Sequence, residues 1–409
     1  MKKADISRST VQQTPRETLL VFGEDWHGLP SSTRHLIKPL CAQYHVVWIN
    51  SIGLRQPRLN KQDMQRILCK LRQFMPSSES ISAPTINSPI KPSALLNLKT
   101  FPAPKSHLMR KLCGQLMARQ IQHALNKLGA QQPIIWASLP TAIDAIKYLA
   151  HKKIIYYCCD DFTSLAGVDH ETVAIHEKEL LNRADLVIAS QQQLAQNLSL
   201  RLASSDTHKA PKILPHGVDY LCFSQVASMA PDLPNNNKPT AGFYGSIASW
   251  LDFSLLNTVI ARHQDWNFVF IGHIETEAST QFLSLSKQSN VYYLGPKEHQ
   301  QLPQYSQHWQ ASLLPFRHCD QINHCNPLKL REYLAAGSSI ISTDFPAIDE
   351  YKNIINIAHT PEQFSQHLNA ISALSHSQKI ALQKKQRLLV KNHSWQARSQ
   401  EIKLWMDQL

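Results

Sequence analysis

A lysine and a glutamate near residue 330 lie in a pattern that suits the binding of a diphosphate. Asn326 and Pro327 are the residue types that begin a helix, with asparagine as the capping residue, and Gly337 is typical of its end. The start of such a helix offers free N–H groups and a positive dipole end to an anion. Lys329 adds a cation, and Glu332 shares its face, where a carboxylate accepts both hydroxyl groups of a ribose diol.

The plainer interpretation of this segment is an amphipathic helix with an exposed Lys329–Glu332 pair. The apolar runs Ala311–Phe316 and Ser339–Thr343 flank the segment and have the composition of buried parallel strands. A capped helix between two such strands opens at the edge of a sheet where ligands bind. This context favours the anion-binding interpretation.

Acidic residues and a histidine in the first half of the chain are candidates for removing a proton from an acceptor. Asp160 and Asp161 follow the apolar run Lys153–Cys158 and are expected at the ligand-binding edge of a sheet. An aspartate at such a position also caps helices, which is the structural alternative. His27 lies in the loop after the first apolar run and is a further catalytic candidate.

The same loop and a later junction supply candidates for binding a sugar or an acceptor. These candidates are Glu24, Gly28, Arg34 and His216. Loops carry function and plain solvation alike, so Glu24 also fits an ordinary loop residue. His216 equally fits a histidine that fills the junction between two domains.

Two series of alternating apolar runs and helical patterns predict an α/β protein with two doubly wound parallel sheets. The first series contains Thr18–Gly23, His45–Asn50, Pro133–Ala137, Lys153–Cys158, Asp185–Ser190 and Lys212–His216. The second contains Ala241–Gly245, Asn267–Gly272, Val291–Gly295, Ala311–Phe316, Ser339–Thr343 and Ile354–Ile357. Two such Rossmann-like domains are expected to face each other across a cleft.

The segment Asn326–Gly337 (NPLKLREYLAAG) resembles the donor-site helix of GT-B glycosyltransferases, above all the family-4-type bacterial enzymes that build teichuronic acids and exopolysaccharides. YYCCDD at 156–161, LPHGVD at 214–219 and YGSI at 244–247 resemble further segments of these enzymes. The resemblance covers most of the chain. A more distant likeness is to the xanthan glucuronosyltransferase.

The resemblance implies roles for individual residues. Lys329 would contact the donor diphosphate and Glu332 the ribose, and an acidic residue at the same strand end of the xanthan enzyme favours Asp161 over Asp160 as the base. Many retaining members carry a glutamate at the position of His324, so inversion and retention both stay open. The full donor-binding set that we expect is Gly245, Ser246, Ile247, Leu294, Gly295, Phe316, His324, Asn326, Leu328, Lys329 and Glu332.

The composition and the resemblance together predict five parts of the 409-residue chain. Residues 1–17 are expected to form a disordered leader, 18–227 an acceptor-binding domain, 228–239 a linker, and 240–390 a domain that binds the nucleotide sugar. The ending at 391–409 resembles the GT-B helix that crosses back to the first domain.

The function implied is transfer of a sugar from a nucleotide-diphosphate donor, by resemblance a UDP-sugar, to a cell-surface polysaccharide or a lipid-linked saccharide. A nucleotide-sugar epimerase and a non-catalytic binding protein of the same fold are the alternatives. The absence of a G-x-G-x-x-G motif after any strand disfavours a dinucleotide oxidoreductase. No metal or other cofactor is expected to be required, because lysine and the helix terminus supply the positive charge.

The net charge of +12 is concentrated at the start of the chain, where residues 1–110 hold 16 Lys and Arg against 6 Asp and Glu. The basic segments Lys61–Arg72 and Lys105–Arg119 fit either an anionic membrane surface or packing on their own domain. No signature of a nucleic-acid-binding domain accompanies the charge. The sparse cysteines and the lack of a long apolar run predict a cytoplasmic protein, with peripheral contact to the inner face of the plasma membrane as an open alternative.

Overall fold

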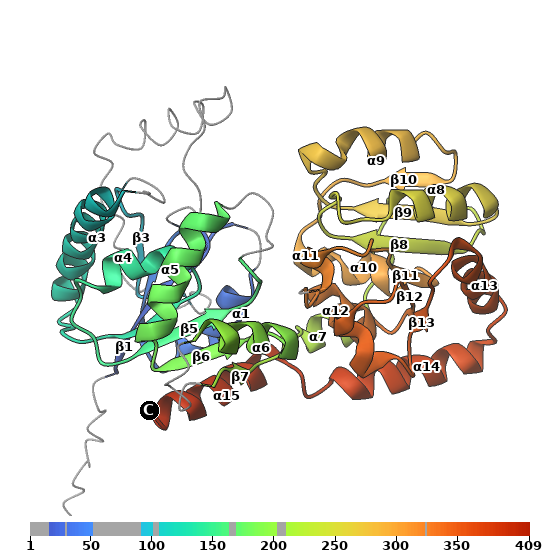
Figure 1. Ribbon diagram of the computed structural model, residues 1–409. Helices are drawn as coiled ribbons and strands as arrows, with labels where there is room; N and C mark the ends of the chain where they lie inside the picture. The colour runs from blue at the N-terminus through green and yellow to red at the C-terminus, as the bar shows by residue number, and fades with distance from the viewer. Residues whose placement is uncertain are drawn as a thin grey trace, which may run out of the picture.

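The computed structural model describes residues 16–28, 31–51, 91–100, 106–162, 169–202, 210–323 and 325–409. These residues form two α/β domains that lie side by side (Figure 1). Each domain is built on one parallel sheet, as the sequence predicts.

The sheet of the first domain has the strand order β3-β2-β1-β4-β5-β6-β7. Along β1, Leu19 and Val21 belong to one buried cluster and Leu20 and Phe22 to another, so both faces of the sheet are covered. This arrangement explains why the strands are apolar throughout. The strands are β1 (Thr18–Phe22), β2 (His45–Ile49), β3 (Ala94–Leu96), β4 (Ile134–Ala137), β5 (Ile154–Cys158), β6 (Leu186–Ala189) and β7 (Lys212–Ile213).

Two groups of helices cover this sheet on opposite faces. One face is covered by α3 (His107–Lys127), α4 (Ile143–Ile146), α5 (His170–Arg183) and α6 (Gln192–Arg201). The other face is covered by α1 (Ser32–Leu40) and by the last helix of the chain, α15 (Trp395–Asp407).

The sheet of the second domain has the order β10-β9-β8-β11-β12-β13 and a single continuous core. Its strands are β8 (Thr240–Tyr244), β9 (Asn267–Ile271), β10 (Val291–Tyr293), β11 (Ala311–Leu314), β12 (Ser339–Ser342) and β13 (Asn356–Ile357). Its helices are α7 (Tyr220–Ser224), α8 (Phe253–Arg262), α9 (Ser279–Leu285), α10 (Pro303–Ser306), α11 (Asp320–Asn323), α12 (Leu328–Ala336), α13 (Pro361–Ser372) and α14 (His376–Val390).

The boundary between the domains lies earlier than the expected residue 227. Val218 and Phe223 are buried in the core of the second domain, and α7 packs against α12. Ala230 and Leu233 of the expected linker are buried in the same core. Residues 228–239 are therefore part of the surface of the second domain and not a free tether.

The chain returns to the first domain through α14 and α15, which run along one side of both domains in Figure 1. The hydroxyl of Ser399 on α15 donates a hydrogen bond to the carbonyl of Leu36 on α1, at 2.5 Å. Trp395 at the start of α15 stacks on the ring of His35, with 4.9 Å between ring centroids. The last helix is thus an integral part of the first domain.

Every apolar run expected to be a strand contains one. The short strand β3 was not predicted, because its residues are only partly buried and lie in a polar, irregular stretch. Residues 1–15 of the expected leader and the basic segment 61–72 lie outside the described residues. No helix in the described part of the chain is long and apolar enough to cross a membrane.

Candidate functional site

The side chain of Lys329 lies at the carboxyl edge of the second sheet. Its ammonium group is 4.4 Å from the ring centroid of Phe243 and 5.5 Å from that of Phe316. A β-carbon at residue 245 would collide with this ammonium, so the glycine that ends β8 makes room for it. Aromatic faces stabilise a cation in such a position without neutralising it.

The positive charge of Lys329 has no ion-pair partner among the described residues. Loss of hydration lowers the pKa of this lysine to about 8, although Cys325 and Glu332 raise it in part. A partly buried ammonium without a carboxylate partner is costly, and a bound anion would offset that cost. This is the property expected of a diphosphate-binding lysine.

The backbone beside Lys329 is brought close together by glycines at the ends of adjacent strands. Gly245 has a φ of +130° and Gly272 a φ of +139°. A β-carbon at residue 272 would collide with the carbonyl oxygen of Gly245. The amide of Gly272 in turn donates to the carbonyl of Gly295, at 3.0 Å. This edge of the sheet therefore presents backbone, and not side chains, to a ligand.

The helix α12 begins one residue later than the sequence predicts. Pro327 occupies the capping position, and the expected cap, Asn326, does not bind the amides of the first turn. Instead, its side-chain amide donates to the carbonyl of Ser190 in the first domain at 3.0 Å and accepts from Arg331 at 2.7 Å. The prediction of Asn326 as the helix cap is wrong, because an interdomain hydrogen bond uses its side chain.

The carboxyl end of α12 follows the sequence prediction. Gly337 takes the left-handed conformation with a φ of +88°. Arg387 on α14 donates to the carbonyls of Ala335 and Ala336, which would otherwise lack partners at the helix end. These contacts fix the helix that carries Lys329 and Glu332.

Glu332 is buried one turn after Lys329 and is hydrogen-bonded to a histidine. Its Oε1 lies 2.7 Å from Nε2 of His299, which begins a short 3₁₀ turn (His299–Gln301) after β10. Burial lowers the pKa of His299, but the hydrogen bond and the charge of Glu332 outweigh this effect and raise it overall. His299 was not predicted from the sequence, although its place soon after an apolar run and Gly295 was a signal.

The two acidic residues after β5 have different environments. Asp161 is buried and accepts two hydrogen bonds from Arg201, at 2.9 and 3.1 Å, and Arg201 also pairs with Glu177. Asp160 receives a hydrogen bond from the Cys159 thiol at 3.4 Å. The structure therefore places Asp161 in an ion-pair network of the first domain and leaves Asp160 as the more available carboxylate.

Asp160 lies close to the second domain. Loss of hydration raises the pKa of Asp160, and the charge of Glu24 raises it further. Burial raises the pKa of the Cys325 thiol to about 12, while Asp160 raises it and Lys329 lowers it. The thiol is thus within electrostatic range of a carboxylate from one domain and an ammonium from the other.

The loop after β1 contributes a further acidic group, Glu24, whose charge acts on Asp160. Oε2 of Glu24 is buried and has no hydrogen-bond partner among the described residues. Arg34 donates to the carbonyls of Trp26 and Gly28, at 2.7 and 3.1 Å, and so holds the loop in place. His27 and Gly28 are exposed.

His216 is buried where the two domains meet. Its Nδ1 lies 3.4 Å from the hydroxyl of Tyr157, and its ring centroid is 6.1 Å from that of Trp395. Burial lowers the pKa of His216 to about 3, with a smaller contribution from Arg331. This position fits the structural alternative, a neutral histidine that fills the junction.

The remaining expected donor residues differ in their burial. Ile247 is buried, Ser246 and Leu294 are partly buried, and Leu328 packs against the core of the first domain. His324 lies outside the described residues. The structure thus gathers Gly245, Phe316, Lys329 and Glu332 at one edge and brings the first domain against the start of α12.

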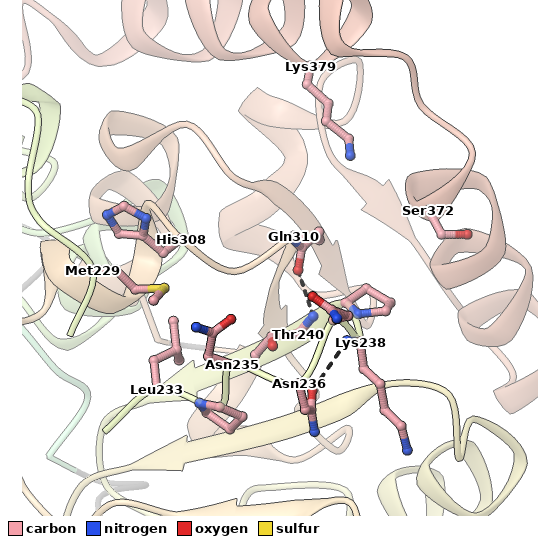
Figure 2. Close-up of a pocket in the computed structure, with 13 residues that line it drawn as sticks. Met229, Leu233, Asn235, Asn236, Lys238, Thr240, His308, Gln310, Ser372 and Lys379 are labelled. Atoms are coloured by element: carbon pink, nitrogen blue, oxygen red, sulfur yellow. Dashed lines mark hydrogen bonds between the residues drawn. The ribbon is translucent and has the colours of Figure 1, made fainter. Parts of the chain in front are cut away.

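A separate pocket lies at the opposite edge of the second sheet (Figure 2). It has a volume of about 410 Å³ and is lined in part by residues 233–240, His308, Gln310 and Lys379. Thr240 begins β8 and Gln310 precedes β11, so the pocket is at the amino ends of these strands. It contains none of the residues expected to bind the donor. Among the described residues, no group of three or more His, Cys, Asp or Glu side chains is placed to hold a metal ion.

Comparison with solved structures identifies the architecture as the GT-B fold. The chain is similar to sucrose-phosphate synthase from Thermosynechococcus elongatus, with a TM-score of 0.69 and 14% identity over 96% of this chain and 99% of the other. It is also similar to HepE from Anabaena in complex with UDP and glucose, with a TM-score of 0.66 and 14% identity over 96% of this chain and 100% of the other.

No family model matches the sequence. A curated relative is TuaH of Bacillus subtilis (strain 168), whose name assigns it provisionally to teichuronic acid biosynthesis as a glycosyltransferase. The two sequences are 25% identical over 224 residues, which are 52% of this chain and 56% of TuaH. The match thus spans about half the length of this relative.

Proposed function

We propose that this protein is a glycosyltransferase that moves a sugar from a nucleotide-diphosphate donor to a saccharide acceptor. The observation that carries the proposal is the unpaired ammonium of Lys329, which lies against Gly245 and two aromatic rings at the edge of the sheet. The GT-B fold and the partial likeness to TuaH support the same class. An epimerase of the same fold would have no use for an acceptor.

The donor that we propose is a UDP-sugar, because HepE, which has the same fold, was crystallised with UDP and glucose. The acceptor class that we propose is a cell-surface polysaccharide or a lipid-linked saccharide, following the name of TuaH. Glu332 would accept hydrogen bonds from the ribose, and Lys329 would pair with the diphosphate.

The reaction that we propose is a direct displacement at the anomeric carbon of the sugar. The acceptor oxygen bonds to this carbon as the bond to the diphosphate oxygen breaks, and the diphosphate leaves with the electron pair. Asp160 takes the proton of the acceptor hydroxyl, for which its raised pKa is suited. Lys329 stabilises the charge that develops on the leaving diphosphate. This displacement inverts the anomeric configuration.

A thermal-shift screen of nucleoside diphosphates and nucleotide sugars tests the proposed donor. UDP or one UDP-sugar should raise the melting temperature, because a ligand that binds only the folded state stabilises it. We propose that no metal is required, so the shift and sugar transfer should persist in EDTA. Loss of transfer in EDTA and recovery with Mg²⁺ would refute metal independence, whereas the absence of any stabilising nucleotide would refute the donor site.

We also propose that the protein rests through α3 on an anionic membrane surface, where a lipid-linked acceptor would be held. Leu108, Leu112 and Leu116 follow each other at intervals of four residues and are 64%, 53% and 47% exposed. Lys111 and Arg119 are exposed on the same side of the helix. Apolar side chains flanked by basic ones suit the interface of an anionic bilayer.

A further inference from the structure

The carboxylate of Glu332 has two basic side chains available to it, and the structure pairs it with only one. Lys329 precedes it by three residues, a spacing at which a lysine and a glutamate on one helix commonly pair. Glu332 instead contacts His299 at 2.7 Å, and Lys329 lies over the rings of Phe243 and Phe316. The two charged groups of α12 are thus kept apart.

The position of His299 is fixed by groups from both domains. Its ring makes an edge contact with Phe223, with 5.3 Å between centroids, and lies 5.8 Å from the ring of His35 on α1. His35 in turn stacks on Trp395 of the crossing helix. The charged groups that act on His299 are Glu332 on α12, Asp219 before α7 and Arg34 on α1. His299 therefore cannot easily turn away from the carboxylate.

The carboxylate of Glu332 also lies near the hydroxyl of Tyr244, which stays neutral because burial raises its pKa well above the usual value. Released from His299, the side chain of Glu332 would be free to turn toward the ammonium of Lys329. Such an internal ion pair would neutralise the positive charge that attracts the diphosphate. It would also occupy the carboxylate that accepts hydrogen bonds from the ribose. We propose that His299 is a positioning residue that withholds Glu332 from Lys329, so that the carboxylate serves the ribose and the ammonium serves the diphosphate. This inference rests on the proposed donor site.

The first test measures affinity for inorganic pyrophosphate, which has no ribose. H299F keeps a ring but loses the hydrogen bond, and it should bind pyrophosphate about fivefold more weakly, the effect of one internal ion pair. The double variant H299F/E332Q should recover native affinity, since it has no carboxylate to pair with Lys329. If the double variant stays as weak as H299F, His299 has only a structural role and the inference is wrong.

The second test compares UDP with 2′-deoxy-UDP. The native protein should prefer UDP by about tenfold or more, the value of a hydrogen bond to a charged group. H299F and E332Q should lose most of this preference, and H299Q, which still carries an N–H donor, should retain it. An unchanged preference in H299F would refute the role of His299, whereas failure of the native protein to bind either nucleotide would refute the donor site itself.

H308F is the matched control, because His308 is a partly buried histidine of the same domain whose Nε2 contacts the carbonyl of Ala227 at 2.7 Å, in the pocket at the amino ends of the strands. It should leave both affinities unchanged. If H299F does not fold, the ring nitrogen resonance of His299 in the native protein gives the answer. That resonance should move more with UDP than with 2′-deoxy-UDP, and equal shifts would count against the inference.

Discussion

The ammonium of Lys329 occupies the space that a β-carbon at residue 245 would need, so any side chain at Gly245 would displace the lysine. The two residues are 84 positions apart in the sequence: Gly245 follows β8, and Lys329 lies in the first turn of α12. In this position the ammonium of Lys329 has no ion-pair partner among the described residues. Several properties of the protein follow from this arrangement.

Replacing Lys329 by methionine should have opposite effects on binding and on stability. K329M should weaken UDP binding by about tenfold or more, because it removes a charge-assisted contact. The empty protein should become more stable by on the order of 1 kcal/mol, because an incompletely hydrated charge is lost. Calorimetric titration and thermal unfolding measure the two effects. K384M, on the exposed face of α14, is the control and should change neither.

The affinity for UDP should fall as the pH rises above about 8. The pKa of Lys329 in the empty protein is about 8, and only its charged form attracts the diphosphate. The stability of the empty protein should change in the opposite direction. Between pH 8 and the unfolded value of 10.5, the unfolded chain holds more protons than the folded one, so this lysine makes the protein more stable as pH rises. K329M should show neither dependence, and a native affinity that is constant to pH 9.5 would contradict the assignment.

Asp160 and Asp161 should respond differently to substitution by asparagine. D160N should fold normally and bind UDP, but its kcat should fall by about 100-fold or more, as expected on removal of a general base. D161N should lose about 1–3 kcal/mol of stability, because Arg201 would lose a buried carboxylate partner. Sugar-transfer assays and denaturant unfolding separate these effects. Full activity in D160N together with an inactive, folded D161N would restore the sequence-based preference for Asp161.

The exposed leucines of α3 should carry binding to anionic vesicles. The double variant L112Q/L116Q should sediment less with phosphatidylglycerol vesicles than the native protein and should keep its affinity for UDP. Binding should weaken with salt, because Lys111 and Arg119 contribute through charge. L388Q changes a leucine that is 72% exposed on α14 and should bind like the native protein. Equal sedimentation of all three proteins would rule out α3 as the membrane contact.

The sequence predicted the fold well because buried parallel strands are continuous apolar runs, which are easily identified. It also predicted that Gly245 and Phe316 lie near Lys329, since the carboxyl ends of parallel strands meet at one edge, but it did not predict Phe243, whose ring is nearer to the ammonium. Short strands with partial burial, such as β3, lack that signal.

The parts of the site that the sequence did not predict depend on contacts between distant residues. Asn326 has the side chain of a helix cap, and only the position of Ser190 shows that it binds the other domain. Asp161 follows a strand as a catalytic base would, but its carboxylate is held in an ion pair with Arg201. His299 becomes relevant only when β10 and α12 are placed side by side.

The hydrogen bond from Asn326 to Ser190 links the proposed donor site to the distance between the domains. Asn326 stands next to the first turn of α12 and is also held by Arg331, so a separation of the domains would pull on the helix that carries Lys329. By thermodynamic reciprocity, a nucleotide that binds better to the joined arrangement must also favour that arrangement. Binding of a nucleotide to the second domain is thereby linked to the position of the first domain, where the acceptor is expected to bind.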